Sequence, residues 1–175
     1  DIEEARLIMA GAPLNYVGVF QNEDPEVISY TVKQLGLSVV QLHGDETPKY
    51  VKTLRALLPK TCEIWKAYGV GENLPDVNKF NVDKHLLDTR VGNQSGGTGK
   101  AFDWSLLDDA QIDKNKIMLA GGLTPENAQQ AALIGCAGLD FNSGVESAPG
   151  KKDKVKLDAA FAAITHYVQR NSEKV

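Results

Sequence analysis

The chain has 175 residues, of which 42% are hydrophobic and 24% charged, a composition typical of one soluble globular domain with a full core. The formal net charge of −4, without a dense Lys/Arg block, argues against nucleic-acid binding, and the basic residues at 151–154 are expected in a solvated loop or helix entry. Two cysteines and three scattered histidines fit neither a disulfide framework nor a metal site, and no apolar run approaches the ~18 residues of a membrane span. No signal peptide is visible, so we expect a cytoplasmic protein.

Predicted strands and helices alternate along the chain. The first ten residues indicate a helix that starts without an initiator Met, which is typical of a piece of a longer chain. Gly36 and Pro59 end the next two helices, and residues 89–101 are expected to form a long glycine-rich loop. The predicted strands are residues 16–20, 38–43, 63–68, 84–88, 116–120 and 137–141, and the predicted helices are residues 24–35, 47–58, 74–80, a segment from Asp103, a segment from Thr124, and 153–170.

Strands separated by helices predict a parallel α/β sheet. Six strands could form an open doubly wound sheet, whereas a (β/α)8 barrel needs eight and implies two more before Asp1. In the second strand Gln41 and His43 share a face, and a strand buried on both sides has no reason to carry them unless that face lines a site. His43 ends the strand where barrels build active sites, so we expect it to contact a substrate; a structural hydrogen bond is the alternative.

Two strand ends near the C-terminus predict a phosphate site. Gly121 and Gly122 follow one strand, and the Thr-Pro pair at 124–125 signals a helix start, so a positive helix end is expected just beyond the glycines. The next strand runs into Asn-Ser-Gly at 142–144. Adjacent loops of this kind are where (β/α)8 barrels bind phosphate, which predicts a phosphorylated small-molecule substrate.

Five ordered motifs resemble phosphoribosylanthranilate isomerase, and the likeness spans essentially the whole chain. The motifs are Gln-Leu-His-Gly-Asp-Glu at 41–46, Leu-Asp at 87–88, and the segments 97–104, 119–127 and 140–153. They look most like the enterobacterial type, in which the isomerase is the C-terminal half of a bifunctional chain with indole-3-glycerol-phosphate synthase. The resemblance therefore implies such a fused or associated partner domain.

The resemblance implies a TIM barrel of the phosphate-binding type whose first two strands are missing, with residues 1–175 as one N-terminally truncated isomerase domain. It also implies an Amadori rearrangement in tryptophan biosynthesis. N-(5-phosphoribosyl)anthranilate would be converted to 1-(2-carboxyphenylamino)-1-deoxyribulose 5-phosphate without metal or cofactor. An acid must protonate the ribose ring oxygen, and a base must remove the C2 proton of the resulting Schiff base.

The motifs of the family imply roles for individual residues. Asp88 matches the general acid, and desolvation should raise its pKa so that it stays protonated; capping of the following loop is the alternative. Gly97 lies in a loop implied to close over the substrate. His43 and Asp140 are implied to contact the substrate, although Asp140 could be a buried polar residue with its own hydrogen bonds. The residues implied to bind phosphate are Gly121, Gly122, Asn142, Ser143 and Gly144.

The base of the family, a Cys after its first strand, and its anthranilate-binding Arg have no match in this chain. Cys62 and Cys136 precede strands, so both are expected at the opposite end of the sheet as small buried residues. This chain alone is therefore expected to be inactive. Two alternatives stay open: another phosphate-binding barrel, of the indole-3-glycerol-phosphate synthase or thiamine-phosphate synthase type, and a fragment that only binds phosphate.

Overall fold

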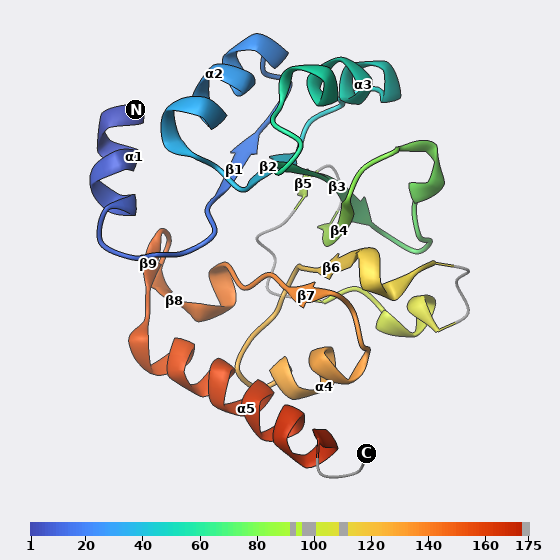
Figure 1. Ribbon diagram of the computed structural model, residues 1–175. Coiled ribbons are helices and arrows are strands. Elements are labelled where there is room, and N and C mark those ends of the chain that lie inside the picture. Colours follow the sequence, from blue (N-terminus) through green and yellow to red (C-terminus); the bar gives the residue numbers. More distant parts are fainter. Residues whose placement is uncertain (92–93, 96–100, 109–111, 173–175) are drawn as a thin grey trace. The chain divides into compact units, whose positions relative to one another are not determined.

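The computed structural model describes residues 1–91, 94–95, 101–108 and 112–172, which form an α/β sheet with helices between its strands (Figure 1). The hydrogen-bonded order of the main strands follows the chain: β1 (Val17–Phe20), β2 (Val39–Leu42), β3 (Glu63–Val70), β4 (Lys84–Val91), β6 (Ile117–Leu119) and β7 (Gly138–Leu139). The pairs β1–β2, β2–β3 and β6–β7 are parallel, as expected for strands joined by helices. The chain divides into two compact units: residues 1–67 with 76–85, and residues 68–75 with 86–175.

The first unit contains three α-helices and one short 3-10 helix. They are α1 (Ile2–Met9), α2 (Pro25–Leu35), α3 (Pro48–Leu57) and η1 (Val77–Lys79). The helix-start signals of the sequence are confirmed, because the side chains of Asp24 and Thr47 each cap a helix whose first residue is proline. Gly36 ends α2 with a φ of +64°, a left-handed conformation that glycine adopts without strain.

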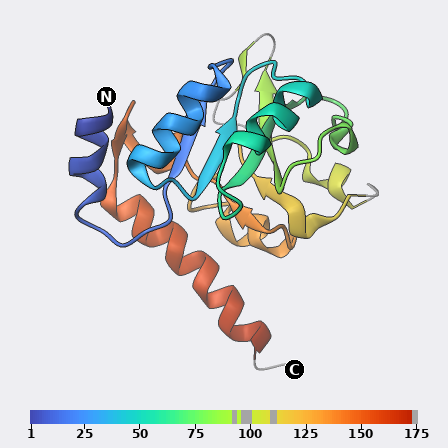
Figure 2. The ribbon, with the colours of Figure 1, turned by 45° about the horizontal axis from the view of Figure 1, so that its top comes forward.

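The core of the first unit lies between its strands and two of its helices. Helices α2 and α3 pack side by side over β1 and β2 (Figures 1 and 2). Their buried residues and the alternate residues of β2 and β3 form one apolar cluster, which includes Ile28, Val32, Val40, Leu42, Val51, Leu54 and Ile64. Since neighbouring strand residues point to opposite faces, the residues between them lie on the other face of the sheet.

The second unit ends in a long helix that Figure 2 shows in red. Its elements besides the main strands are β5 (Gln94–Ser95), η2 (Trp104–Leu107), η3 (Lys114–Lys116), α4 (Ala128–Leu133), η4 (Ser143–Val145), β8 (Glu146–Ala148), β9 (Lys151–Lys152) and α5 (Lys154–Ser172). A small apolar cluster at Ala128, Val145 and Ala160 joins α4, η4 and α5. No helix in the described part of the chain is both long and apolar enough to cross a bilayer.

The structure confirms the alternation of strands and helices but corrects several boundaries. The helix expected from Thr124 begins only at Ala128, and the segments expected as helices at 74–80 and from Asp103 are short 3-10 turns. Strand β4 continues through Val91, because β5 returns along it as an antiparallel partner. The β8–β9 hairpin was not predicted; its strands are too short to give an alternating pattern.

Candidate active site

The turn after β6 lies directly against a carboxylate of β4. Gly121 has a φ of +81°, and a Cβ built on it would lie 2.5 Å from Asp88 Oδ1 and 2.3 Å from the backbone nitrogen of Thr89. The adjacent Ala120 donates its N–H to the carbonyl of Leu87 over 2.9 Å, which fixes the register. Glycine is therefore required at this position for two reasons, the backbone conformation and the lack of space for a side chain. Its small size lets the loop after β6 lie against Asp88.

Asp88 does not end its strand as the sequence predicted, because β4 runs on to Val91. Asp88 is half-buried, and its Oδ1 atom is shielded from solvent. The neighbouring Thr89 is buried and its hydroxyl accepts a hydrogen bond from Phe102 N–H over 2.9 Å. That bond ties Phe102 to β4 beside Asp88. Gly97, expected to contact the substrate from the glycine-rich loop, lies outside the described residues.

The two glycine loops meet, as their positions at neighbouring strand ends predicted. A Cβ built on Gly144 would lie 1.9 Å from the carbonyl oxygen of Leu123 and 3.0 Å from Thr124 Cγ2. The turn that begins with Asn142 and Ser143 therefore packs onto the backbone of the loop after Gly122. Asn142 and Ser143 are exposed, so their polar groups are accessible to a ligand.

The first of these loops is held by Asn127, a residue that the sequence analysis passed over. Thr124 N–H donates to Asn127 Oδ1 over 2.8 Å, and Asn127 Nδ2 donates to the carbonyl of Gly122 over 2.9 Å. These bonds close a turn and delay the helix, which explains why Thr124 does not cap it. Gly122 itself has a φ of +66°. Because α4 is short and begins six residues later, the positive helix end that the sequence predicted just beyond the glycines does not lie there.

The second loop is held by Lys152, which sequence reasoning assigned to solvent. Its Nζ donates to the backbone oxygen of Asn142 over 2.9 Å, to Asn142 Oδ1 over 2.7 Å and to Glu146 Oε1 over 2.8 Å. The hydrogen bond from Lys152 holds the pKa of Glu146 below its usual value. The β8–β9 hairpin that carries both residues thus fixes the turn of Asn142. Only the tertiary fold reveals this, since the hairpin itself was not predicted.

Asp140 directly follows β7, and its N–H donates to the carbonyl of Leu119 over 2.8 Å, so it extends the ladder with β6. It is half-buried. The next residue, Phe141, packs against the apolar cluster beneath α4 and α5. Alternation along an extended segment then directs Asp140 to the face opposite that of Phe141.

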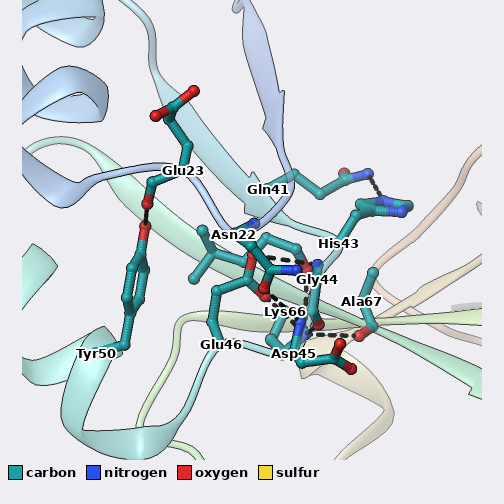
Figure 3. A network of polar contacts seen from close by, with 11 residues as sticks. Asn22, Glu23, Gln41, His43, Gly44, Asp45, Glu46, Tyr50, Lys66 and Ala67 are labelled. Atoms are coloured by element: carbon teal, nitrogen blue, oxygen red, sulfur yellow. Dashed lines mark hydrogen bonds and ion pairs between the residues drawn. The ribbon is translucent and has the colours of Figure 1, made fainter.

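In the first unit, Gln41 and His43 do share one face of β2. Their Nε2 atoms lie 2.5 Å apart, Gln41 is buried, and His43 is half-buried at the end of the strand (Figure 3). The residues between and before them, Leu42 and Val40, lie in the apolar cluster on the other side. The face predicted to carry polar function is therefore separate from the face that packs on the helices.

A buried ion pair lies beyond the end of β2, and Figure 3 shows its surroundings. Lys66 Nζ and Glu46 Oε2 are 3.1 Å apart, with side chains only 6% and 1% exposed. Burial alone would raise the pKa of Glu46, but the hydrogen bond from Asn22 N–H and the ammonium of Lys66 outweigh it and hold the pKa below its usual value. No sequence signal pointed to this pair, since Glu46 appeared only as the last residue of the 41–46 motif.

Both cysteines lie just before strands, as the sequence predicted. Cys62 precedes β3 and is buried, and Cys136 precedes β7 and is half-buried rather than fully buried. Burial raises the pKa of both thiols. Neither is therefore poised as a thiolate base, and neither lies at the carboxyl end of its strand.

Comparison with known proteins identifies the family of the chain. A family model described as N-(5'phosphoribosyl)anthranilate (PRA) isomerase matches residues 2–163. The tryptophan biosynthesis protein TrpCF of Vibrio parahaemolyticus is 61% identical over 167 residues, which cover 95% of this chain and 34% of that protein. The TrpCF of Vibrio cholerae is 56% identical, with 95% and 35% covered. The chain thus spans about a third of the length of these curated relatives.

Solved structures give the same result. Phosphoribosyl anthranilate isomerase from Thermus thermophilus superposes with a TM-score of 0.76 at 32% identity, over 95% of this chain and 80% of that one. A phosphoribosyl anthranilate isomerase in complex with reduced 1-(o-carboxyphenylamino)-1-deoxyribulose 5-phosphate has a TM-score of 0.73 at 31% identity, with the same coverage. These neighbours are of the TIM-barrel type, which confirms the predicted fold class. On the family match, the identities and the shared fold, the chain belongs to the N-(5'-phosphoribosyl)anthranilate isomerase family.

Proposed function

We propose that this chain supplies the phosphate site and the general acid of a phosphoribosylanthranilate isomerase in tryptophan biosynthesis. The reaction is the Amadori rearrangement of N-(5-phosphoribosyl)anthranilate to 1-(2-carboxyphenylamino)-1-deoxyribulose 5-phosphate. One observation carries the proposal: the glycine turn after β6 touches the Asp88 carboxylate on one side and the Asn142–Gly144 turn on the other. An acid therefore lies beside paired loops suited to a phosphate, in a chain of the isomerase family.

The loops would bind the phosphate mainly through backbone N–H groups. The donors are those of Gly121, Gly122, Ser143 and Gly144, with the Asn142 turn held in place by Lys152. Such donors are fixed before the ligand arrives, so binding costs little reorganisation. The family likeness to the complex with a reduced ribulose phosphate supports a sugar phosphate as the ligand.

Asp88 would then donate its proton to the ribose ring oxygen as the C1–O bond breaks, which leaves an open-chain Schiff base. Removal of the C2 proton gives an enolamine, and tautomerisation of this species gives the ketone product. The shielding of Asp88 Oδ1 supports this role, since desolvation favours the protonated acid. For His43 and Asp140 we propose contacts to the substrate, and for Gly97 a place in the loop that closes over it.

A base must remove the proton at C2, and neither thiol of this sequence is suited to do so. Burial raises the pKa of Cys62 and Cys136, and both residues precede their strands. We therefore propose that residues 1–175 alone bind phosphate but do not turn over substrate, and that a further segment supplies the base. The parent protein would be a cytoplasmic, bifunctional chain with an indole-3-glycerol-phosphate synthase domain. Its likeness to TrpCF proteins about three times as long supports this.

The direct test is the substitution Asp88→Asn in the parent protein. Loss of a general acid should lower kcat at least ~10²-fold. The dissociation constant of reduced 1-(o-carboxyphenylamino)-1-deoxyribulose 5-phosphate, the reduced product, should change much less. Asn has the size of Asp and can still form a hydrogen bond. Asp113→Asn is the matched control, since Asp113 is an exposed cap of η3 in the same unit and should leave kcat unchanged. An Asp88→Asn enzyme with normal kcat would place the acid elsewhere, with His43 the next candidate.

A further inference from the structure

The buried pair of Glu46 and Lys66 joins the loops after β1 and β2 to strand β3 of the first unit. Lys66 is on β3, in register with Leu42 of β2, and Glu46 lies in the loop between β2 and α3. Asn22, in the loop after β1, is the third member of the cluster. The pair has no part in the proposed proton transfers. It lies beside the ends of β1 and β2, and barrels carry their functional loops at the carboxyl ends of their strands.

Each charged group of the pair is bonded to backbone. Glu46 Oε1 accepts the N–H of Asn22 over 2.9 Å and the N–H of Gly44 over 3.1 Å. Lys66 Nζ donates to the carbonyl of Gly44 over 2.7 Å and to that of Ala67 over 3.2 Å. The loops after β1 and β2 are therefore held to strand β3 by one ion pair (Figure 3).

The backbone held in this way cannot relax freely. Asn22 has a φ of +53°, which is unusual for a residue with a side chain, and its Oδ1 accepts the N–H of Asp45 over 2.8 Å. A Cβ built on Gly44 would lie 2.3 Å from that same Oδ1 atom. Tyr50 adds a further bond from its hydroxyl to the carbonyl of Glu23. The two loops are thus interlocked at the residue that follows His43.

An apolar pair of the same size could fill this space at least as favourably, because burying two charges costs solvation. It could not satisfy the N–H groups of Asn22 and Gly44 or the carbonyls of Gly44 and Ala67. The charges therefore serve to fix the backbone rather than to increase the free energy of unfolding. The backbone that they fix includes Gly44, the residue that directly follows His43.

We infer that Glu46 and Lys66 are positioning residues, which act through Gly44 to hold the His43 imidazole in the orientation that contacts the substrate. The inference rests on the proposed function only for the identity of the ligand. Lys66 and Glu46 themselves are not expected to touch substrate.

The test compares three variants of the full chain. Lys66→Met leaves Glu46 without its cation, and Glu46→Gln/Lys66→Met removes both charges while Gln Oε1 can still accept the two N–H groups. Lys84→Met is the matched control, because Lys84 pairs with Glu63, on the same strand β3 as Lys66. The measurements are the NMR signals of the His43 ring, the exchange of the Gly44 and Asn22 amides, the thermal midpoint, and the affinities for the reduced product and for inorganic phosphate.

We expect Lys66→Met and the double variant to shift the His43 signals and to speed amide exchange at Gly44. Both variants should also bind the reduced product at least tenfold more weakly, which is about the effect of losing one hydrogen bond to the ligand. The double variant should regain thermal midpoint but not the His43 signals, since the carbonyls of Gly44 and Ala67 still lack a donor. Inorganic phosphate should bind all variants equally, because its proposed residues lie in the other unit.

Unchanged His43 signals in Lys66→Met would overturn the positioning role, as would a recovery of those signals that simply follows the thermal midpoint in the double variant. Equal weakening of reduced product and phosphate would show general unfolding and would also overturn it. If the unsubstituted chain bound neither ligand, the proposed function would fail, while the NMR comparison would still decide the positioning role.

Discussion

Gly144 lies where the loops after β6 and β7 meet, and its missing side chain allows them to meet. The Cβ of Gly144→Ala would fall 1.9 Å from the Leu123 carbonyl oxygen, a backbone atom that cannot move alone. We expect the variant to lose about 1–3 kcal/mol of unfolding free energy, the usual cost of overpacking, and to bind inorganic phosphate more weakly. Denaturant titration and calorimetry measure the two effects.

Gly71→Ala is the control for this prediction, because a Cβ on Gly71 meets nothing within 4 Å and the residue belongs to the same unit. It should leave phosphate affinity unchanged. Phosphate binding by Gly144→Ala as tight as in the unsubstituted chain would mean that the junction of the two loops is not the anion site.

Glu46 makes the free energy of unfolding depend on pH in the acidic range. Its pKa is lower in the folded chain than the usual 4.5, so its contribution to stability is present above 4.5 and is lost as pH falls through the folded pKa. The free energy of unfolding should therefore fall as the pH drops below 4.5, and it should fall less steeply in Glu46→Gln. Urea titrations at a series of pH values test this. An equally steep fall in the variant would assign the acid sensitivity to other carboxylates.

Among the elements, the short β8–β9 hairpin supports the turn at Asn142. Lys152 reaches from β9 to both oxygens of Asn142, so the hairpin fixes the turn that leads to Ser143 and Gly144. We expect Lys152→Met to weaken inorganic phosphate binding about two- to tenfold, the scale of a lost hydrogen bond near a charge. Calorimetric titration at constant ionic strength gives the affinity.

Lys154→Met is the natural comparison for Lys152→Met. Lys154 pairs with Asp158 within α5 and is largely exposed, so its loss removes the same charge without touching the turn. If both variants weakened phosphate binding equally, the effect would be one of net charge, and the role of the hairpin as a support for the turn would be wrong.

At the scale of the molecule, the described sheet ends in β1 on one side, and this strand is not covered like an inner strand. Val17 and Val19 are 41% and 60% exposed, although a strand of a closed parallel barrel is buried on both faces. An exposed edge of this kind is a template for another strand. This supports the proposal that the active enzyme requires a further segment of protein beside these residues.

We therefore expect residues 1–175 alone to show no measurable isomerase activity, since loss of a catalytic base costs ~10²–10⁴-fold. A co-expressed fragment that carries two βα units and a cysteine at the end of its first strand should restore turnover. A Cys→Ser change in that fragment should abolish the rescue. Robust turnover by the chain alone, shown intact by mass spectrometry, would contradict both the missing base and the need for a partner segment.

Local sequence determined much of this protein. The N-caps Asp24 and Thr47, the prolines that follow them and the stop at Gly36 act within a few residues, so α2 and α3 are where their signals predict. The alternation of apolar strands with helices determined a parallel sheet, and the glycines after β6 and β7 determined two loops at neighbouring strand ends. These features follow from backbone geometry and burial period, which short segments carry by themselves.

Only the tertiary structure decided which polar groups pair across those loops. Asn127 displaces the expected helix start because its amide finds both Thr124 N–H and the Gly122 carbonyl, and Lys152 leaves solvent because a hairpin brings it to Asn142. Glu46 and Lys66 are twenty residues apart, and their charges are tolerated in the interior only because the fold brings the loops after β1 and β2 to Lys66 on β3. Hydrogen-bond partners distant in sequence are set by the packing of strands, and no local pattern encodes that packing.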